Sequence, residues 1–161
     1  MPATTESKPR QVRRARSADF AAIRLLEAAC FQPYRQASVA SLRRSLAQNA
    51  KRSGRQSVWV LDGKDGRLDG LLVLWHHPRR LRVYDVAVHP RLQGKGLGCM
   101  LVAHAEALAR QAGCTWVSLE ADPKEPGLVD WYERRGYATV ARLPAYYKDG
   151  RSAVRMTKRV A

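Results

Sequence analysis

The residues best suited to chemistry are three glycines at alternating positions, Gly94, Gly96 and Gly98, in the stretch HPRLQGKGLGCM (89–100). Glycine costs conformational entropy on folding and buries no side chain, so this spacing indicates that another group approaches the backbone closely. An extended apolar run precedes the stretch, and an amphipathic run follows it. The first amides of a helix are unpaired and its N-terminal dipole end is positive. The stretch is therefore typical of a site for a phosphate group.

The glycine spacing excludes the two commonest phosphate motifs. The dinucleotide fingerprint G-x-G-x-x-G requires a third glycine where Cys99 stands, and the P-loop requires Ser or Thr after its lysine, where Gly96 follows Lys95. What remains is Q-x-x-G-x-G, formed by Gln93, Gly96 and Gly98. We therefore expect the backbone amides of this loop to hold a pyrophosphate, because no side chain obstructs it.

Apolar periodicity predicts the elements that position this loop. The order of elements is β-αα-βββ-α-β-α-ββ, which predicts one α/β domain over residues 10–161 with a mixed, largely antiparallel sheet of about seven strands. A parallel strand pair is expected around the glycine loop. Ser17 and Ser38 are expected as helix N-caps, and residues 1–9 as a flexible tail. Strands are predicted at 10–15, 56–61, 68–75, 81–89, 115–121, 137–143 and 152–160, and helices at 17–31, 38–50, 97–112 and 128–135.

Composition limits the classes of partner. The chain has 161 residues, enough for one hydrophobic core, and no apolar run long enough to span a membrane, so no membrane partner is expected. Cys30, Cys99 and Cys114 form no CxxC pair, and the histidines show no metal-ligand spacing, so we predict no metal. An odd number of cysteines suggests no disulfide framework, so we predict a cytoplasmic location. The net charge of +15 suits either an anionic partner or a solvated, arginine-rich surface.

At V-A-V-H-P-R-L-Q-G-K-G-L-G (86–98) the sequence resembles the GNAT superfamily of acetyl-CoA-dependent N-acetyltransferases. Two further pieces support the resemblance: L-E-A-D (119–122) followed by W-Y-E-R-R-G-Y (131–137), and A-Y-Y-K-D-G-R-S-A-V-R-M (145–156). Together they are most similar to the subgroup that acetylates protein N-termini, including ribosomal-protein alanine acetyltransferases. The resemblance implies helices on both faces of the sheet and acetyl-CoA in a cleft where strands 81–89 and 115–121 splay apart.

The resemblance also implies where the coenzyme is bound. The backbone of Val86 and Val88 would pair with the pantetheine arm, the N–H of Val88 would donate to the oxyanion, and the loop amides would hold the pyrophosphate. The predicted coenzyme-binding residues are Val86, Ala87, Val88, Gln93, Gly94, Lys95, Gly96, Leu97, Gly98 and Cys99.

Glu120 and Tyr132 are the predicted catalytic pair. Acetyl transfer to an amine requires removal of the ammonium proton and a proton for the departing thiolate. Glu120 interrupts the apolar strand WVSLEA, and the resemblance implies that it is the base. An ion pair with an arginine is the alternative role for Glu120. Asp85 is the alternative base. Tyr132 matches the family's general acid, because a phenol donates without ionising at neutral pH. Packing of Tyr132 onto the sheet is the competing interpretation.

The acceptor is expected to contact Asp85 and the pair Tyr146 and Tyr147, which lies between the last two strands. In the resembling subgroup such a pair lines the groove for the acceptor's first residues; packing of the hairpin is the alternative. The predicted function is direct acetyl transfer from acetyl-CoA to a protein or peptide α-amine, or to lysine, with a ribosome-associated protein as one partner. A small-molecule amine, and a non-catalytic nucleic-acid-binding or regulatory domain on the same fold, remain alternatives. A homodimer is left open.

Overall fold

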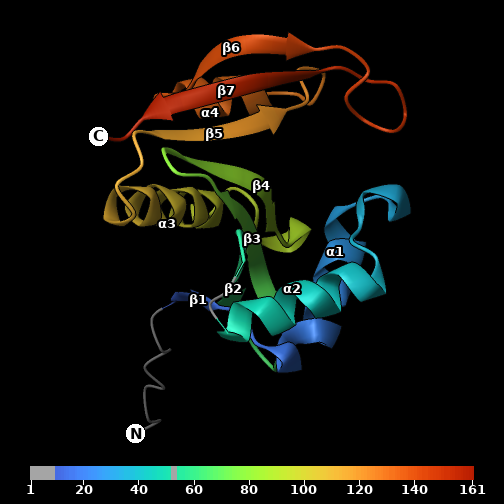
Figure 1. Cartoon of the computed structure of the whole chain (residues 1–161). Helices are drawn as coiled ribbons and strands as arrows, with labels where there is room; N and C mark the ends of the chain where they lie inside the picture. Colours follow the sequence, from blue (N-terminus) through green and yellow to red (C-terminus); the bar gives the residue numbers. More distant parts are fainter. Residues whose placement is uncertain (1–9, 52–53) are drawn as a thin grey trace, which may run out of the picture.

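The computed structural model describes residues 10–51 and 54–161, which form one seven-stranded sheet flanked by helices (Figure 1). The strand order is β1-β2-β3-β4-β5-β7-β6. The mixed sheet confirms the predicted fold class, and the predicted tail at 1–9 lies outside the described residues. The strands are β1 (Val12–Arg14), β2 (Gln56–Asp62), β3 (Leu68–His76), β4 (Arg80–Val88), β5 (Trp116–Ala121), β6 (Ala138–Leu143) and β7 (Ala153–Arg159). The helices are α1 (Phe20–Cys30), α2 (Val39–Lys51), α3 (Leu97–Gln111) and α4 (Leu128–Glu133).

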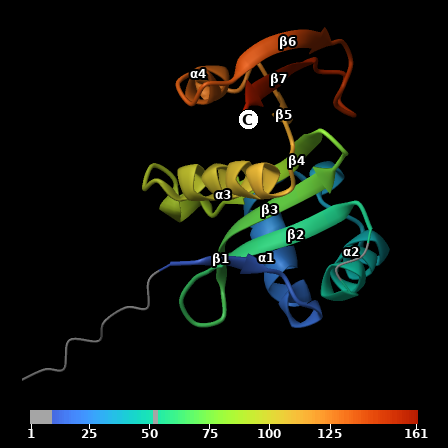
Figure 2. The ribbon, with the colours of Figure 1, turned by 60° about the vertical axis from the view of Figure 1, so that its left-hand side comes forward.

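The helices cover both faces of the sheet (Figure 2). Successive strand side chains point to opposite faces, so Leu71 packs in the core under α1 and α2, whereas its neighbour Leu72 packs in the core under α3. Tyr132 of α4 belongs to the second core. In the described part of the chain no helix is long and apolar enough to cross a membrane, and no three His, Cys, Asp or Glu side chains are grouped as metal ligands would be.

The N-caps of the first two helices differ from each other. Ser38 caps α2, because its Oγ accepts the N–H of Ser41 at 3.1 Å. Ser17 does not cap α1 but opens a 3₁₀ turn over Ser17–Asp19, in which the Asp19 carboxylate accepts the N–H of Arg16 at 2.7 Å. The cap predicted at Ser17 was therefore wrong, because Asp19 holds the turn through which the chain enters α1.

The parallel pair β4–β5 separates before either strand ends. Its register runs from Arg80 opposite Trp116 to Val83 opposite Leu119, and the pairing stops there. On the other side of β4, pairing with β3 shifts between Val73 and Leu74, so that Tyr84 is an extra residue in a β-bulge. A bulge bends its strand and increases the local twist. The bulge and the end of the parallel pairing together open a gap in the sheet beyond Val83.

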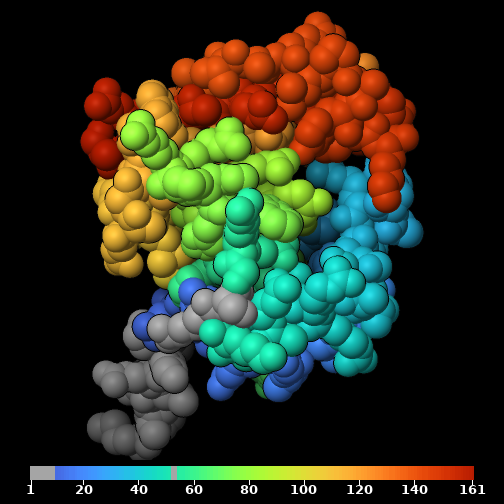
Figure 3. All heavy atoms as spheres, viewed as in Figure 1, coloured from blue at the N-terminus to red at the C-terminus, as the bar shows by residue number. Residues whose placement is uncertain are grey.

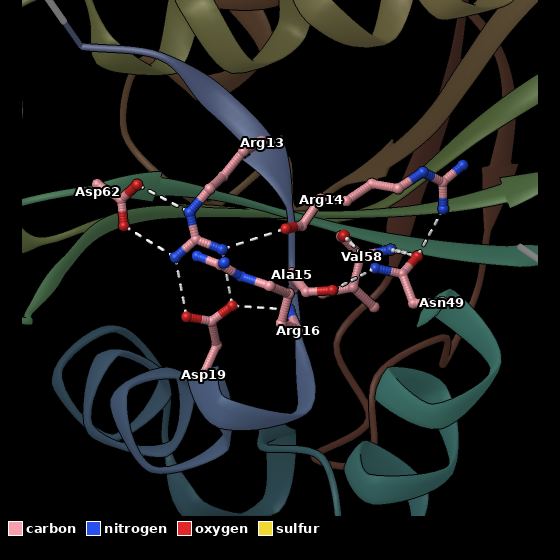
Figure 4. A network of polar contacts seen from close by, with 8 residues as sticks. All are labelled: Arg13, Arg14, Ala15, Arg16, Asp19, Asn49, Val58 and Asp62. Atoms are coloured by element: carbon pink, nitrogen blue, oxygen red, sulfur yellow. Dashed lines mark hydrogen bonds and ion pairs between the residues drawn. The ribbon is translucent and has the colours of Figure 1, made fainter. Parts of the chain in front are cut away.

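A buried asparagine joins β1, β2 and α2 (Figure 4). Asn49 of α2 is 2% exposed, and its Nδ2 donates to the carbonyl oxygens of Ala15 and Val58 at 2.8 and 2.9 Å. Its Oδ1 accepts from the Val58 N–H at 3.2 Å and from the Arg14 guanidinium at 2.9 Å. Asn49 thus pairs the N–H of Val58 and the carbonyl of Ala15, and it shares the carbonyl of Val58 with the N–H of Ala15 at 2.9 Å.

We expect Asn49→Ala to lower the free energy of unfolding by about 2–3 kcal/mol, because it leaves buried donors and acceptors without partners. Urea unfolding followed by circular dichroism measures the change. Arg44→Ala, on the exposed side of the same helix, is the control and should change the value by less than about 0.5 kcal/mol. Equal effects of the two substitutions would contradict this role of Asn49.

Candidate active site

A cavity of about 660 Å³ occupies the gap between the separated ends of β4 and β5. Its volume lies within the range of ~300–1,000 Å³ usual for small-molecule sites. Its walls are the second half of β4, the glycine loop, the end of β5 and one side of α4. We refer to it as the cleft.

The glycine loop forms one end of the cleft. Gly94 and Gly96 have φ values of +78° and +83°, in the left-handed region that favours glycine, and a Cβ atom on either would meet no atom within 4 Å. Gly96 immediately precedes α3. Within the described residues the first backbone donation from this segment is from Met100 to Gly96 at 3.1 Å, so the amides of residues 94–99 have no backbone partner. Free amides at the start of a 15-residue helix fit a pyrophosphate.

The backbone of β4 also faces the cleft. The N–H of His89 donates to Asp69 on β3 at 2.9 Å. Because successive amides of a strand point to opposite sides, the N–H of Val88 points away from β3 and toward the cleft. Val86 lies two residues earlier, and its N–H points the same way. These are the two amides predicted to contact the pantetheine arm and the oxyanion.

Most of the predicted coenzyme-binding residues line the cleft. Ala87 and Leu97 do not, because both side chains are 5% exposed and pack in the two cores. Lys95 is exposed at the tip of the loop. Those that line the cleft are Val86, Val88, Gln93, Gly94, Gly96, Gly98 and Cys99.

Arg135 adds a positive charge beside the glycine loop. Its guanidinium lies 3.5 Å from the centre of the Trp131 ring and donates to the Cys99 sulfur at 2.7 and 3.0 Å. Arg135 lines the cleft together with Trp131 and Cys99. Arg135 was not among the site residues predicted from the sequence. Arg135 follows the end of α4, and only the fold shows that it turns toward the cleft.

Tyr132 lies on the floor of the cleft. Its side chain is 4% exposed, and its ring packs edge-on against Trp131 at 4.9 Å and Tyr137 at 5.6 Å between centroids. Burial raises the pKa of Tyr132 to about 12, with Arg135 opposing the shift. The hydroxyl therefore stays protonated at neutral pH and can donate a hydrogen bond. Tyr132 therefore packs in the core, as one interpretation predicted, and also lines the cleft, as the other predicted.

Glu120 lines the cleft but is engaged by two arginines. Its Oε1 accepts from Nε and Nη2 of Arg155 at 3.2 and 3.1 Å, and its Oε2 accepts from Nε of Arg82 at 3.0 Å. A carboxylate accepts about four hydrogen bonds in total, so most of its lone pairs are occupied. Arg82 also donates to the Tyr146 hydroxyl at 2.8 Å, and Tyr146 lies outside the cleft lining.

Asp85 lies in the cleft one residue beyond the bulge at Tyr84. Burial raises the pKa of Asp85 to about 7; the charge of Arg35 opposes the shift, and that of Glu27 adds to it. No Lys, Arg or His among residues 10–51 and 54–161 forms an ion pair with Asp85 within 4.0 Å. A carboxylate with this pKa can accept a proton near neutral pH.

Two loops meet over the end of the cleft that Asp85 and Tyr147 line. The Arg35 guanidinium, between α1 and α2, lies 5.2 Å from the centre of the Tyr147 ring. The neighbouring Tyr34 hydroxyl donates to the Asp149 carboxylate at 3.3 Å. Figure 3 shows the orange-red β6–β7 loop lying against the light-blue α1–α2 segment. Of the predicted tyrosine pair, Tyr147 therefore faces the cleft, whereas Tyr146 is held by Arg82.

Two curated proteins are similar in sequence to part of this chain. Streptothricin acetyltransferase of Streptomyces lavendulae is 32% identical over 95 residues, which are 56% of this chain and 49% of that protein. The N-alpha-acetyltransferase MAK3 of Arabidopsis thaliana is 34% identical over 64 residues, 40% of this chain and 34% of that protein. The chain thus spans about half or less of the length of these curated relatives.

One solved structure illustrates the shared fold. The ribosomal-protein-S18-alanine N-acetyltransferase of Escherichia coli superposes with a TM-score of 0.77 over 95% of both chains, at 20% identity. The family described as "Acetyltransferase (GNAT) family" matches residues 20–137 of this chain, which include α4 and every residue that lines the cleft except Tyr147. The resemblance predicted from the glycine loop is thereby confirmed, and the chain belongs to the GNAT family of acetyltransferases.

Proposed function

We propose that this protein transfers an acetyl group from acetyl-CoA directly to a primary amine. The observation that carries the proposal is a single cleft with free loop amides at one end and Asp85 and Tyr132 in its walls. The amides of residues 94–99 would hold the pyrophosphate, and Arg135 would add charge beside them. The pantetheine arm would extend along β4, where the N–H groups of Val86 and Val88 point into the cleft.

The reaction would need one proton acceptor and two hydrogen-bond donors. Asp85 takes the proton from the acceptor ammonium, and the neutral amine attacks the thioester carbonyl carbon. The N–H of Val88 donates to the oxyanion that forms. When the new C–N bond is complete, the C–S bond breaks and the Tyr132 hydroxyl gives its proton to the departing thiolate, which leaves as the thiol. The extra proton that the new amide nitrogen still carries passes to the Tyr132 oxygen, so that the amide is neutral and the hydroxyl is restored.

We assign proton removal to Asp85 instead of the Glu120 predicted from the sequence. Three hydrogen bonds from Arg82 and Arg155 occupy the Glu120 carboxylate, whereas the carboxylate of Asp85 has no ion-pair partner among the described residues. Glu120 would then be a positioning residue. It holds Arg82, which in turn holds Tyr146 at the edge of the acceptor side.

The proposed acceptor is the α-amine of a peptide or protein, with a ribosome-associated protein as a partner suited to the charge of +15. The names of MAK3 and of the Escherichia coli fold neighbour support this class. The name of the streptothricin acetyltransferase supports a small-molecule amine as the second candidate. Three free cysteines fit the reducing conditions of the cytoplasm.

A panel of acceptors tests the proposal. Acetyl-CoA turnover would be measured with a peptide bearing a free α-amine, the same peptide with its α-amine blocked and an internal lysine, and n-butylamine. We expect the free α-amine peptide to react fastest. Fastest turnover with n-butylamine would move the assignment to small amines, and no turnover with any of the three would refute amine acetylation.

Tyr132→Phe is expected to lower kcat by about 10- to 100-fold and to change the KM for acetyl-CoA less than twofold, because a donor to the thiolate acts on the chemical step. Steady-state kinetics with a saturating amine measures both constants. Tyr137→Phe is the matched control, since its ring packs against Tyr132 while its hydroxyl donates to Glu106 at 3.0 Å, away from the cleft. Equal kcat values for the two variants would contradict a catalytic role for the Tyr132 hydroxyl.

A further inference from the structure

A second cavity, of about 150 Å³, lies between the sheet and the helices α1 and α2. Its walls include the carboxylate residues Glu27 and Asp85, the aromatic rings of Trp75 and Tyr84, and the apolar side chains of Ile23 and Leu42. Asp85 and Tyr84 line both this cavity and the cleft. The two cavities therefore adjoin at Tyr84 and Asp85. We refer to it as the side cavity.

Glu27 has a buried oxygen without a partner. The residue is 3% exposed, and its Oε2 accepts the N–H of Ala37 at 2.8 Å, whereas its buried Oε1 has no hydrogen-bond partner among the described residues. Burial raises the pKa of Glu27. A buried polar atom without a partner costs free energy, so Oε1 calls for a hydrogen-bond donor in the side cavity. The buried Nε1–H of Trp75, in another wall of the cavity, also has no partner among the described residues and calls for an acceptor, such as a water molecule beside the bound group.

Three arginines lie near the side cavity, and one of them, Arg82, lies 5.3 Å from the centre of the Tyr84 ring in its wall. Arg24 donates to the carbonyl oxygen of Ala37 at 2.5 Å, and Arg35 lies over the rings of Phe31 and Tyr147. Within residues 10–51 and 54–161, no basic side chain forms an ion pair with Glu27 or Asp85 within 4.0 Å. The side cavity is thus locally acidic in a protein whose net charge is +15.

We propose that the side cavity binds the second ammonium group of an acceptor that carries two amines on a short aliphatic chain. One amine reacts beside Asp85 in the cleft, while the other pairs with Oε1 of Glu27. The inference rests on the proposed function, because it takes the cleft as the site of the reacting amine.

The chemistry and size of the side cavity suit such a group. Carboxylates together with aromatic rings favour a cation, and the rings of Trp75 and Tyr84 lie edge to face with centroids 6.4 Å apart. Apolar walls accommodate the methylene groups of an alkylammonium chain. A cavity of about 150 Å³ in another protein accommodates benzene, a ligand comparable in size to a butylammonium chain.

Isothermal titration calorimetry in the presence of CoA, which binds without reacting, tests the inference. The probes are putrescine and n-butylamine, which share one carbon chain with and without the second amine. We expect putrescine to bind at least about tenfold more tightly, and Glu27→Gln to remove that difference, because a charge-assisted hydrogen bond is lost. Gln retains an oxygen for the N–H of Ala37. Glu133→Gln, an exposed position on α4, controls for the change in net charge.

An acceptor with two amines can be a small diamine or a peptide that carries a lysine. A second pair of probes distinguishes them, namely peptides with a free α-amine and either lysine or norleucine as the second residue. The inference is supported if the protein prefers putrescine over n-butylamine, or lysine over norleucine, and if Glu27→Gln removes that preference. The first preference identifies a small diamine as the acceptor, and the second identifies a peptide. Equal binding within both pairs would overturn the inference and leave the cavity to water. Failure of the proposed function is a different result, namely no amine-dependent loss of acetyl-CoA.

Discussion

Asp85→Asn is expected to lower kcat/KM for the amine by a hundredfold or more and to abolish the rise of the rate around pH 7. The asparagine side chain cannot accept the ammonium proton, and general-base catalysis contributes about 10²–10⁴-fold. The pKa of Asp85 is raised to about 7, so in the wild-type protein the basic form, and with it the rate, increases as the pH passes through 7. A pH series of kcat/KM for the wild-type and variant proteins measures this.

Two controls separate this role from a structural one. Glu120→Gln should retain the increase around pH 7, because its carboxylate already accepts from Arg82 and Arg155. The free energy of unfolding provides the second control, since a carboxyl whose pKa is raised by folding destabilises the protein once it is ionised. Asp85→Asn should therefore stabilise the protein at pH 8. It should not do so at a pH below 3.8, the ordinary pKa of the aspartate carboxyl, where the carboxyl is protonated in both the folded and the unfolded protein. Loss of the increase in Glu120→Gln, but not in Asp85→Asn, would return the base to Glu120.

Gly96→Val is expected to weaken acetyl-CoA binding by about a hundredfold while the protein remains folded. A Cβ at Gly96 would meet no protein atom within 4 Å, so the added side chain would project into space that the loop amides leave for a pyrophosphate. Isothermal titration calorimetry with CoA measures the affinity.

Backbone strain must be separated from obstruction, because Gly96 has a φ of +83°. Gly113, at the other end of α3, has a φ of +75° and also has no atom within 4 Å of a Cβ. Gly113→Val therefore introduces similar strain away from the cleft and should leave the affinity for CoA within about twofold. Equal losses of affinity in the two variants would show that strain, and not obstruction of the pyrophosphate, causes the effect.

The elements of the fold were predictable because their patterns are local. The alternation in LRVYDVAVH and the helical spacing after Gly96 predicted β4 and α3 close to their observed bounds. The position of β7 between β5 and β6 was not predicted, because strand order depends on long-range pairing. The bulge at Tyr84 also escaped prediction, since a bulge is defined by the register with β3.

The candidate site was predictable where the backbone itself provides the groups. The glycine loop could be recognised because phosphate binding requires missing side chains at fixed spacing. The partners of Glu120 could not be recognised from the sequence, because Arg82 and Arg155 lie 38 and 35 residues away along the chain. For the same reason the sequence did not reveal that Glu27 and Asp85 line one cavity.

The most direct test of the account is to follow an isotopically labelled acetyl group from acetyl-CoA in the presence of a peptide with a free α-amine. Mass spectrometry would record the label on the peptide and on the protein, with and without the amine. Direct transfer predicts a labelled amide on the peptide, CoA release only when the amine is present, and no label on the protein. A labelled protein formed without the amine, or CoA release without a labelled amide, would contradict the account.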